Sequence, residues 1–112
     1  MLKDSKLKIY VDMDGVICTN TWGEYEKAIP IYDNIIEINR LYDEGHTIVI
    51  WTARGGTTNI DWSELNKRQL KEWGVKYHYF DLHKPTYDIL IDDKAINSVK
   101  MLKSLRNRFK QR

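Results

Sequence analysis

Short apolar runs alternate along this chain with longer segments of helical periodicity, and this alternation restricts the fold more than any other feature. Apolar residues three or four positions apart predict helices from Ile31 to Gly45, from Asp61 to Gly74, and over residues 95–110. Strands that alternate with helices predict an α/β fold: a three-layer, Rossmann-like parallel sheet with helices on both faces. The runs with the length and composition of strands lie at residues 7–11, 46–51, 75–80 and 88–91.

The length and cysteine content narrow the class of protein further. A chain of 112 residues is sufficient for one domain, so we expect a single domain over residues 1–112. The one cysteine, Cys18, cannot form an internal disulfide or a cysteine-rich zinc site. The N-terminus lacks the pattern of a signal peptide, and no apolar run approaches the length of a membrane span. We therefore expect a cytoplasmic protein that does not bind membranes.

The basic residues are concentrated at the C-terminal end. Residues 94–112 carry seven Lys or Arg and no acid, whereas all sixteen acids precede them. Such a tail can indicate binding to nucleic acid or to an anionic membrane. Regular apolar positions in the tail favour instead the solvated face of the helix over residues 95–110, so nucleic acid is not an expected partner.

Polar side chains follow each of the four predicted strands. In an open parallel sheet, ligands bind beyond the carboxyl ends of the strands, so these side chains are expected to meet at one edge. No single one of these residues indicates a particular function, but their common position at the ends of the strands does. In strand order they are Asp12 and Asp14, Thr52 and Arg54, His83 and Lys84, and Asp92 and Asp93.

This combination suits phosphoryl transfer through a carboxylate. Residues two apart in an extended segment point to the same side, so Asp12 and Asp14 can both face the site. One carboxylate can attack phosphorus while the other carries the proton. A phosphate dianion repels carboxylates, which predicts Mg²⁺ held by acidic oxygens, with Asp92 and Asp93 as further ligands. Thr52 and Lys84 would hold the phosphoryl oxygens.

Four motifs in this order resemble those of the haloacid-dehalogenase-like (HAD) phosphatases. They read YVDMDGV, IVIWTAR, the lysine of HKPTYD, and ILIDDKA, and the resemblance covers about residues 7–97. It implies that Asp12 is the nucleophile and a metal ligand, and that Asp14 is the acid/base with its main-chain carbonyl on the metal. The remaining implied roles are phosphoryl binding by Thr52 and Lys84 and metal binding by Asp92 and Asp93.

The chain resembles the small members of that family that lack a cap domain and are associated with bacterial capsule or surface-polysaccharide synthesis. The gaps between motifs, 37 residues after Asp14 and 31 after Thr52, leave no room for a cap. Specificity for a small phosphorylated metabolite, a sugar phosphate or a small polyol or amino-alcohol phosphate, must then come from a flap over residues 15–29, from the loop 53–60, or from a neighbouring subunit of a homo-oligomer.

Three further residues are candidate substrate contacts. Arg54 can bind a substrate phosphate or carboxylate, or form a salt bridge within its loop. Trp22 lies in the flap and can cover the site or pack on the body of the protein. His83, beside Lys84, can contact substrate or lie on the surface.

Other functions share part of this pattern. A response-regulator receiver uses acids, a threonine, a lysine and Mg²⁺, but in receivers the acid pair comes first, whereas here Asp92 and Asp93 come last. A nucleic-acid-end or protein phosphatase keeps the chemistry and changes the substrate, with salt-sensitive polynucleotide binding as its sign. A non-catalytic binding module would have no need of Asp14 as a proton carrier.

Overall fold

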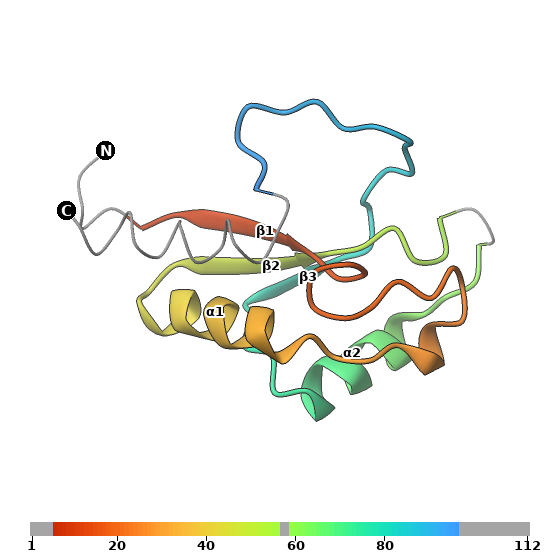
Figure 1. The fold of residues 1–112 in the computed structure, drawn as a ribbon, viewed down its shortest axis with the longest axis horizontal. Helices are drawn as coiled ribbons and strands as arrows, with labels where there is room; N and C mark the ends of the chain where they lie inside the picture. Colours follow the sequence, from red (N-terminus) through yellow and green to blue (C-terminus); the bar gives the residue numbers. More distant parts are fainter. Residues whose placement is uncertain (1–5, 57–58, 97–112) are drawn as a thin grey trace.

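A computed structural model describes residues 6–56 and 59–96 and shows a three-stranded parallel sheet with two α-helices (Figure 1). The strands lie side by side in the order β1-β2-β3. None of the helices in the described residues has the length and apolar character needed to cross a membrane. In chain order the elements are β1 (Lys8–Asp12), the 3₁₀ helix η1 (Tyr25–Lys27), α1 (Tyr32–Asp43), β2 (Thr47–Trp51), α2 (Ser63–Glu72) and β3 (Tyr79–Asp81).

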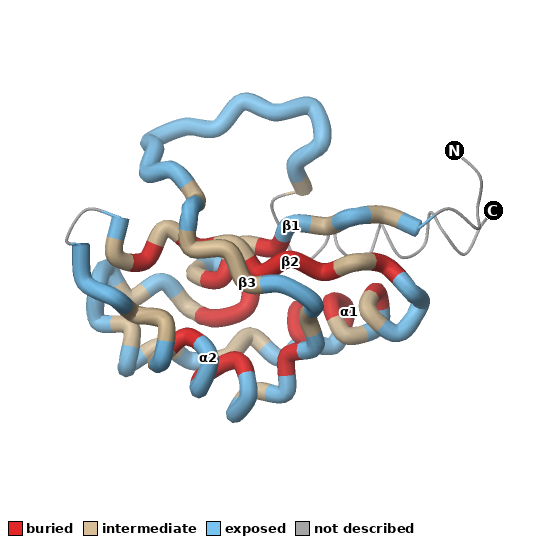
Figure 2. Tube along the Cα trace, turned by 180° about the vertical axis from the view of Figure 1, so that it is seen from behind, coloured by how far each residue is buried: buried red, intermediate tan, exposed pale blue. Residues whose placement is uncertain are grey.

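Both α-helices lie on the same side of the sheet (Figures 1 and 2). Each successive strand is added at the same edge, and right-handed crossovers that progress in one direction place their helices on one face. The helix predicted over residues 95–110 would provide the second layer. Residues 95 and 96 are not helical, and the rest of that segment lies outside the described residues.

The register divides the sheet into two faces of different character. Val11 pairs with Ile50, and Ile50 with Phe80, on the face toward the helices. Val11 and Ile50 are buried, and they belong to the hydrophobic core that also includes residues of α1 and α2 (Figure 2). On the outer face Tyr10 and Tyr79 are 48% and 63% exposed. The described residues therefore cover one face of the sheet well and leave the other open.

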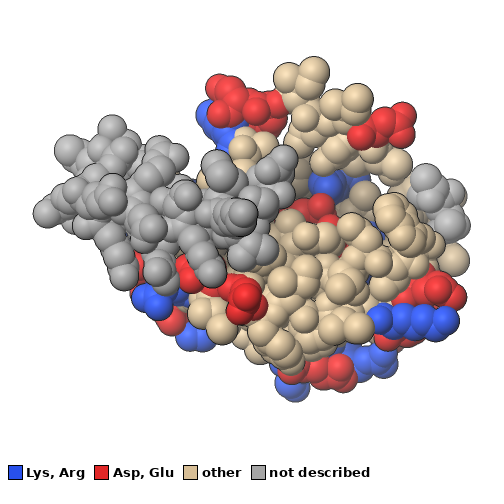
Figure 3. Space-filling view, viewed as in Figure 1, with Lys and Arg blue, Asp and Glu red and all other residues tan. Residues whose placement is uncertain are grey.

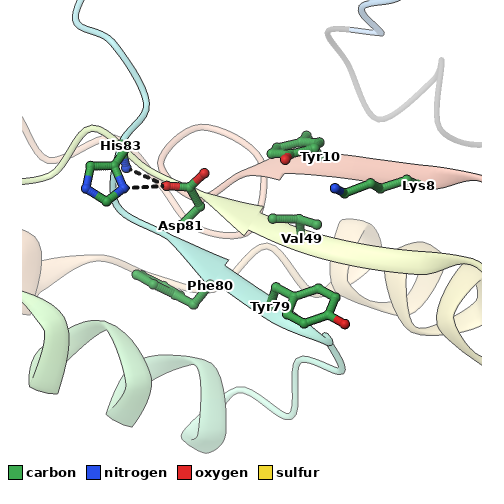
Figure 4. A pocket seen from close by; sticks show the side chains of 7 residues that line it. All are labelled: Lys8, Tyr10, Val49, Tyr79, Phe80, Asp81 and His83. Carbon is green, nitrogen blue, oxygen red and sulfur yellow. Dashed lines mark hydrogen bonds and ion pairs between the residues drawn. The ribbon is translucent and has the colours of Figure 1, made fainter.

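The outer face is hollowed near β3, where a pocket of about 450 Å³ lies over all three strands (Figure 4). Tyr10, Tyr79 and Lys8 project beside it, and His83 bonds to Asp81 at its rim. The residues that line it include none of Asp12, Asp14, Thr52 and Lys84. It is therefore not the pocket of the predicted phosphoryl site.

The two helices and the first two strands confirm the sequence-based predictions within one or two residues. In α1, Ile35, Ile38 and Leu41 are buried at the spacing of one helical face. At the start of α2, Oδ1 of Asp61 accepts a 2.9 Å hydrogen bond from the amide of Ser63, which occupies an N–H that the helix leaves free.

One strand prediction is wrong in part and another is wrong altogether. The strand predicted over residues 75–80 is shortened to β3, because the residues before β3 make other hydrogen bonds. The amide of Lys76, for example, donates to Oδ1 of Asn39 at 2.8 Å. Residues 88–91 are not a strand. They belong to the segment 82–96, which arches away from the sheet and makes no strand pairing with the described residues (Figure 1). A short run of this kind becomes a strand only when an edge pairs with it.

Candidate active site at the carboxyl edge of the sheet

The carboxyl ends of the three strands meet at one edge, where the register sets Asp12 beside Trp51 and Trp51 beside Asp81. Lys84 follows β3 and reaches back across this edge. Its Nζ donates a 3.0 Å hydrogen bond to Oδ2 of Asp12, and it lies 5.8 Å from the centroid of the Trp51 ring. The structure thus brings together the predicted nucleophile and a predicted phosphate-binding residue from distant parts of the chain.

Burial is the largest single influence on the pKa of Asp12 and on that of Lys84. It raises the pKa of Asp12, and the hydrogen bond and charge of Lys84 oppose the shift without cancelling it. The neighbouring charge of Asp14 raises the same pKa a little further. Burial lowers the pKa of Lys84, but the hydrogen bond and charge of Asp12, together with those of Tyr87, outweigh burial, so the pKa is raised. The site therefore holds a firmly charged ammonium beside a carboxylate that is poorly solvated.

A tight turn after β1 sets the position of Asp14. The carbonyl of the buried Met13 accepts hydrogen bonds from amides of the turn, including that of Cys18 at 3.2 Å. Gly15 has φ +92°, a conformation that side chains disfavour, and a Cβ there would lie 3.1 Å from the amide nitrogen of Asn20. The Asp-Gly sequence therefore allows the chain to reverse directly after the second carboxylate.

Asp14 is held by a two-pronged ion pair with Arg54. Nε of Arg54 donates to Oδ2 at 2.9 Å, and Nη2 donates to Oδ1 at 2.7 Å. The Arg54 side chain is fully buried, whereas 20% of the Asp14 side chain is exposed. The planar guanidinium thereby fixes the orientation of the carboxylate from inside the protein and leaves its other side open.

The other donors of Arg54 are also occupied. Nη1 donates to Oδ1 of Asn66 and to Oε1 of Gln69, both at 2.7 Å, and the Tyr25 ring centroid lies 4.5 Å from the guanidinium carbon. The sequence made Arg54 a candidate for substrate contact. The structure instead buries its guanidinium against protein groups, so it is a positioning residue for Asp14.

Cys18 packs against the same ion pair. Its Sγ lies 3.5 Å from Oδ1 of Asp14 and 3.5 Å from Nη2 of Arg54. Burial, together with the charge of Asp14, raises the pKa of this thiol to about 12. The raised pKa favours the protonated thiol at neutral pH, which is a weak nucleophile.

Thr52 directly follows β2 and is almost fully buried. Its Oγ1 accepts a 3.1 Å hydrogen bond from the amide of Arg54, and its main-chain carbonyl accepts one of 3.4 Å from the amide of Lys84. Thr52 thus lies at the predicted edge, and its hydrogen bonds fix the backbone at Arg54 and at Lys84. Phosphoryl binding by its hydroxyl stays a prediction.

Asp92 and Asp93 do not join this edge. Both are exposed on the arch of residues 82–96, and Figure 3 shows acidic side chains on the arch away from the body of the molecule. Within the described residues, no three His, Cys, Asp or Glu side chains come together as a metal site. At the edge, the Asp14 carboxylate pairs with Arg54 and the Asp81 carboxylate pairs with His83. Of the predicted magnesium ligands, the structure therefore places Asp12 and the main chain of Asp14 at the edge, and it places Asp92 and Asp93 away from it.

The two remaining candidates lie in different places. His83, with 94% of its side chain exposed, pairs with Oδ1 of Asp81 at 3.0 Å on the rim of the outer pocket (Figure 4). Trp22 is 91% exposed and lines a second pocket together with Asp14. The structure brings Trp22, and not His83, to the side of the site where the proton carrier is expected.

Asn66 and Gln69 were not predicted as site residues. They lie three positions apart on α2, both buried, and their side-chain oxygens fix Arg54. The signal that indicates them is the presence of two amides on the same helix face as the buried Leu70. A buried amide needs a hydrogen-bonding partner, so such positions point to a polar network beneath a site.

Comparisons with known proteins show the fold and not the activity. No protein-family model matches the chain, and no curated protein matches it. A crystal structure of a protein from Vibrio cholerae superposes with a TM-score of 0.77 at 24% sequence identity, over 96% of this chain and 98% of that chain. A chain of closely similar length therefore adopts the same small α/β fold.

Proposed function

We propose that this protein is a phosphatase that hydrolyses a phosphate monoester of a small metabolite through an aspartyl-phosphate on Asp12. The observation that carries the proposal is the 3.0 Å contact between Oδ2 of Asp12 and Nζ of Lys84 at the carboxyl edge of the sheet. A buried carboxylate beside a fixed ammonium can approach a phosphoryl group whose oxygens the ammonium neutralises.

The proposed reaction has two displacement steps. The first step begins with Asp14 protonated. A carboxylate oxygen of Asp12 attacks phosphorus, the bond from phosphorus to the ester oxygen breaks, and Asp14 gives its proton to that oxygen and becomes the carboxylate that pairs with Arg54. Water then attacks phosphorus, Asp14 takes a proton from the water, and the bond to Asp12 breaks to release inorganic phosphate. Arg54 keeps the Asp14 carboxylate in one orientation during both steps.

Mg²⁺ belongs to the proposal as a cation that would offset the charge of the phosphoryl oxygens. Asp12 and the backbone at Asp14 are the described groups at the edge that would bind it. Asp92 and Asp93 would have to leave their exposed positions to take part.

The sequence supplies the finer parts of the proposal. The alternation of strands and helices supplies helices on both faces of the sheet, and the cysteine content and the N-terminal composition supply a cytoplasmic location. The resemblance supplies a capless core and a place in the synthesis of capsule or surface polysaccharide. On the face shown in Figure 3, the described basic side chains lie among acidic ones. The nucleic-acid alternative rests on the basic residues of the tail, and all of them after Lys94 lie outside the described residues.

Phosphate release from phenyl phosphate, with Mg²⁺ or with a chelator, tests the proposal. We expect turnover that needs Mg²⁺ and falls to background in Asp12→Asn. The matched control is Asp33→Asn, which removes an exposed carboxylate from the first turn of α1 and should keep full activity. Borohydride reduction of quenched enzyme converts an acyl phosphate to homoserine, so it should mark position 12. Turnover that survives Asp12→Asn contradicts the proposal.

A further inference from the structure

A pocket of about 400 Å³ opens on the side of Asp14 that Arg54 leaves free. Residues 20–23, Tyr25 and the loop that leads into α2 form its walls. Its volume is in the range that small-molecule ligands occupy. If Asp14 protonates the ester oxygen, as the proposed function requires, the leaving group must lie in this pocket.

Aromatic side chains form a rigid corner of the pocket. The rings of Tyr25 and Trp62 meet edge to face, with centroids 5.0 Å apart and planes at 84°. Tyr25 also stacks on the buried guanidinium of Arg54, and its carbonyl accepts a 2.7 Å hydrogen bond from Nε2 of Gln69. A perpendicular corner suits the non-planar faces of a saturated ring, whereas a flat base is bound by stacking on an aromatic face.

The backbone at Trp22 holds a third aromatic ring at the pocket in a strained conformation. Trp22 has φ 56°, which is rare for a bulky side chain, and its side chain gains no burial from it, since the residue is 91% exposed. Gly23 follows with φ +102° and completes the turn. Strain that gains no packing is typical of segments that position a group for a ligand.

One buried hydrogen-bonding group in the pocket wall has no partner. The hydroxyl of Thr21 is buried, and it makes no hydrogen bond within the described residues. Asn20, the residue before it, is exposed and also lines the pocket. Buried polar groups are normally paired, so the unpaired hydroxyl of Thr21 indicates a ligand with hydroxyl groups of its own.

The charge of the pocket restricts the ligand further. Among the described residues that line it there is no Lys or Arg. A second phosphate or a carboxylate on the leaving group would therefore have no lining cation to pair with, which is unfavourable in a partly buried site.

From the aromatic walls, the unpaired hydroxyl of Thr21 and the lack of a lining cation, we infer that the pocket is the leaving-group subsite and binds an uncharged, hydroxyl-bearing ring. The substrate class is then the monophosphate of a neutral sugar, without a second anionic group. This inference rests on the proposed function for the direction of the ester, but the pocket itself can be tested by binding.

Relative kcat/KM values test the substrate class. We expect a hexose monophosphate to exceed both a hexose bisphosphate and adenosine monophosphate. Thr21→Val removes the hydroxyl at constant shape, and Asn20→Ala removes the amide. Each should lower the ratio of kcat/KM for the hexose monophosphate to that for phenyl phosphate by about five-fold, the loss expected for one hydrogen bond. Tyr32→Ala, an exposed aromatic residue outside the pocket, should leave the ratio unchanged.

Binding of the unphosphorylated hexose separates this inference from the proposed function. We expect the NMR signals of the Asn20 side-chain amide and the Trp22 and Trp62 indoles to shift with the sugar, and to shift less in Thr21→Val. Binding without any phosphate release would refute the proposed function and support the pocket. Phosphate release with no such shifts, with equal ratios in both variants, or with preference for the bisphosphate or the nucleotide would overturn the inference, as would the absence of both binding and release.

Discussion

Lys84 and Asp12 form the contact on which the proposed chemistry depends, and their protonation is coupled. The side chains of Asp12 and Lys84 are 34% and 12% exposed. Each charged group is therefore partly removed from water, and the opposite charge of its partner stabilises it. The raised pKa of Asp12 shows that burial outweighs the ion pair for the acid. The proposed nucleophile is therefore more basic than an ordinary aspartate while Lys84 limits how far its pKa rises.

Replacing Lys84 with Met should raise the pKa of Asp12 further, because the hydrogen bond and charge that lower it are lost. We expect the carboxyl titration of Asp12, followed by NMR, to move to higher pH, which is the effect of removing a close opposite charge. Lys76→Met is the control, since it removes a lysine from an exposed ion pair with Asp43. An Asp12 titration that stays in place or moves to lower pH in Lys84→Met would refute this coupling.

Arg54→Met should destabilise the protein strongly, because it leaves Asp14 without its cation and two buried side-chain oxygens without a donor. Breaking a buried ion pair costs about 3–5 kcal/mol, and we expect a loss of that order in urea unfolding. Arg68→Met removes an exposed arginine that pairs with Glu72 at 3.8 Å, and it should cost about 0.5 kcal/mol or less. Similar losses in the two variants would show that the network is not structural.

The sequence indicated which residues come to the sheet edge more readily than what each one contacts. Asp12 and Lys84 could be placed there because both follow strands, and parallel strands end at one edge. The burial of Arg54 could not be predicted from its position two residues past Thr52, because it depends on Asn66 and Gln69 of a later helix. Contacts between residues far apart in the sequence are difficult to predict from the spacing of neighbouring residues.

At the scale of elements, a histidine joins the beginnings of the first two strands. His46 is buried just before β2, and its Nδ1 accepts a 3.0 Å hydrogen bond from the amide of Leu7, just before β1. This bond requires an unprotonated Nδ1. Burial is the largest cause that lowers the pKa of His46, and the charge of Glu44 opposes it.

The lowered pKa predicts loss of stability in acid. Because the folded state binds the proton less tightly than the unfolded state, the contribution is complete above the unfolded pKa, about 6.5, and is lost as pH falls through the lower folded pKa. We expect the urea midpoint to fall between pH 7.5 and 5 less in His46→Gln than in the wild type. His83→Gln, at an exposed histidine, should keep the wild-type dependence. Equal losses in wild type and His46→Gln would assign the effect to other groups.

Helices and strands with a clear apolar pattern of their own could be predicted nearly to the residue. Strands that form only by pairing with a neighbouring strand could not. α1 presents Ile35, Ile38 and Leu41 on one face, and the apolar run of β2 is buried on both, so the local pattern suffices. β3 is short because hydrogen bonds to α1 hold the residues before it, and residues 88–91 lack the strand partner that would define them. Pairing of an edge is a property of the assembled sheet.

At the scale of the whole molecule, the described sheet ends with one side of β1 unpaired, and a strongly apolar segment lies exposed. Ile89, Leu90 and Ile91 are 79%, 50% and 94% exposed. Three consecutive apolar residues are typical of a parallel strand buried on both faces, and they are costly in water. The free edge of β1 offers backbone groups to such a strand, and its addition there would carry Asp92 and Asp93 toward Asp12.

We predict that residues 88–91 pair with the free edge of β1 when Mg²⁺ is supplied, because the cation offsets the repulsion among the acids that this pairing brings together. Hydrogen exchange should then slow at the amides of residues 89–91 on addition of Mg²⁺. The double variant Asp92→Asn, Asp93→Asn should lose this Mg²⁺-dependent protection, whereas Asp88→Asn, at the start of the same segment, should retain it. Exchange that is equally fast with and without Mg²⁺ would show that Asp92 and Asp93 are not ligands, and equally slow exchange would show that the strand forms by apolar burial alone.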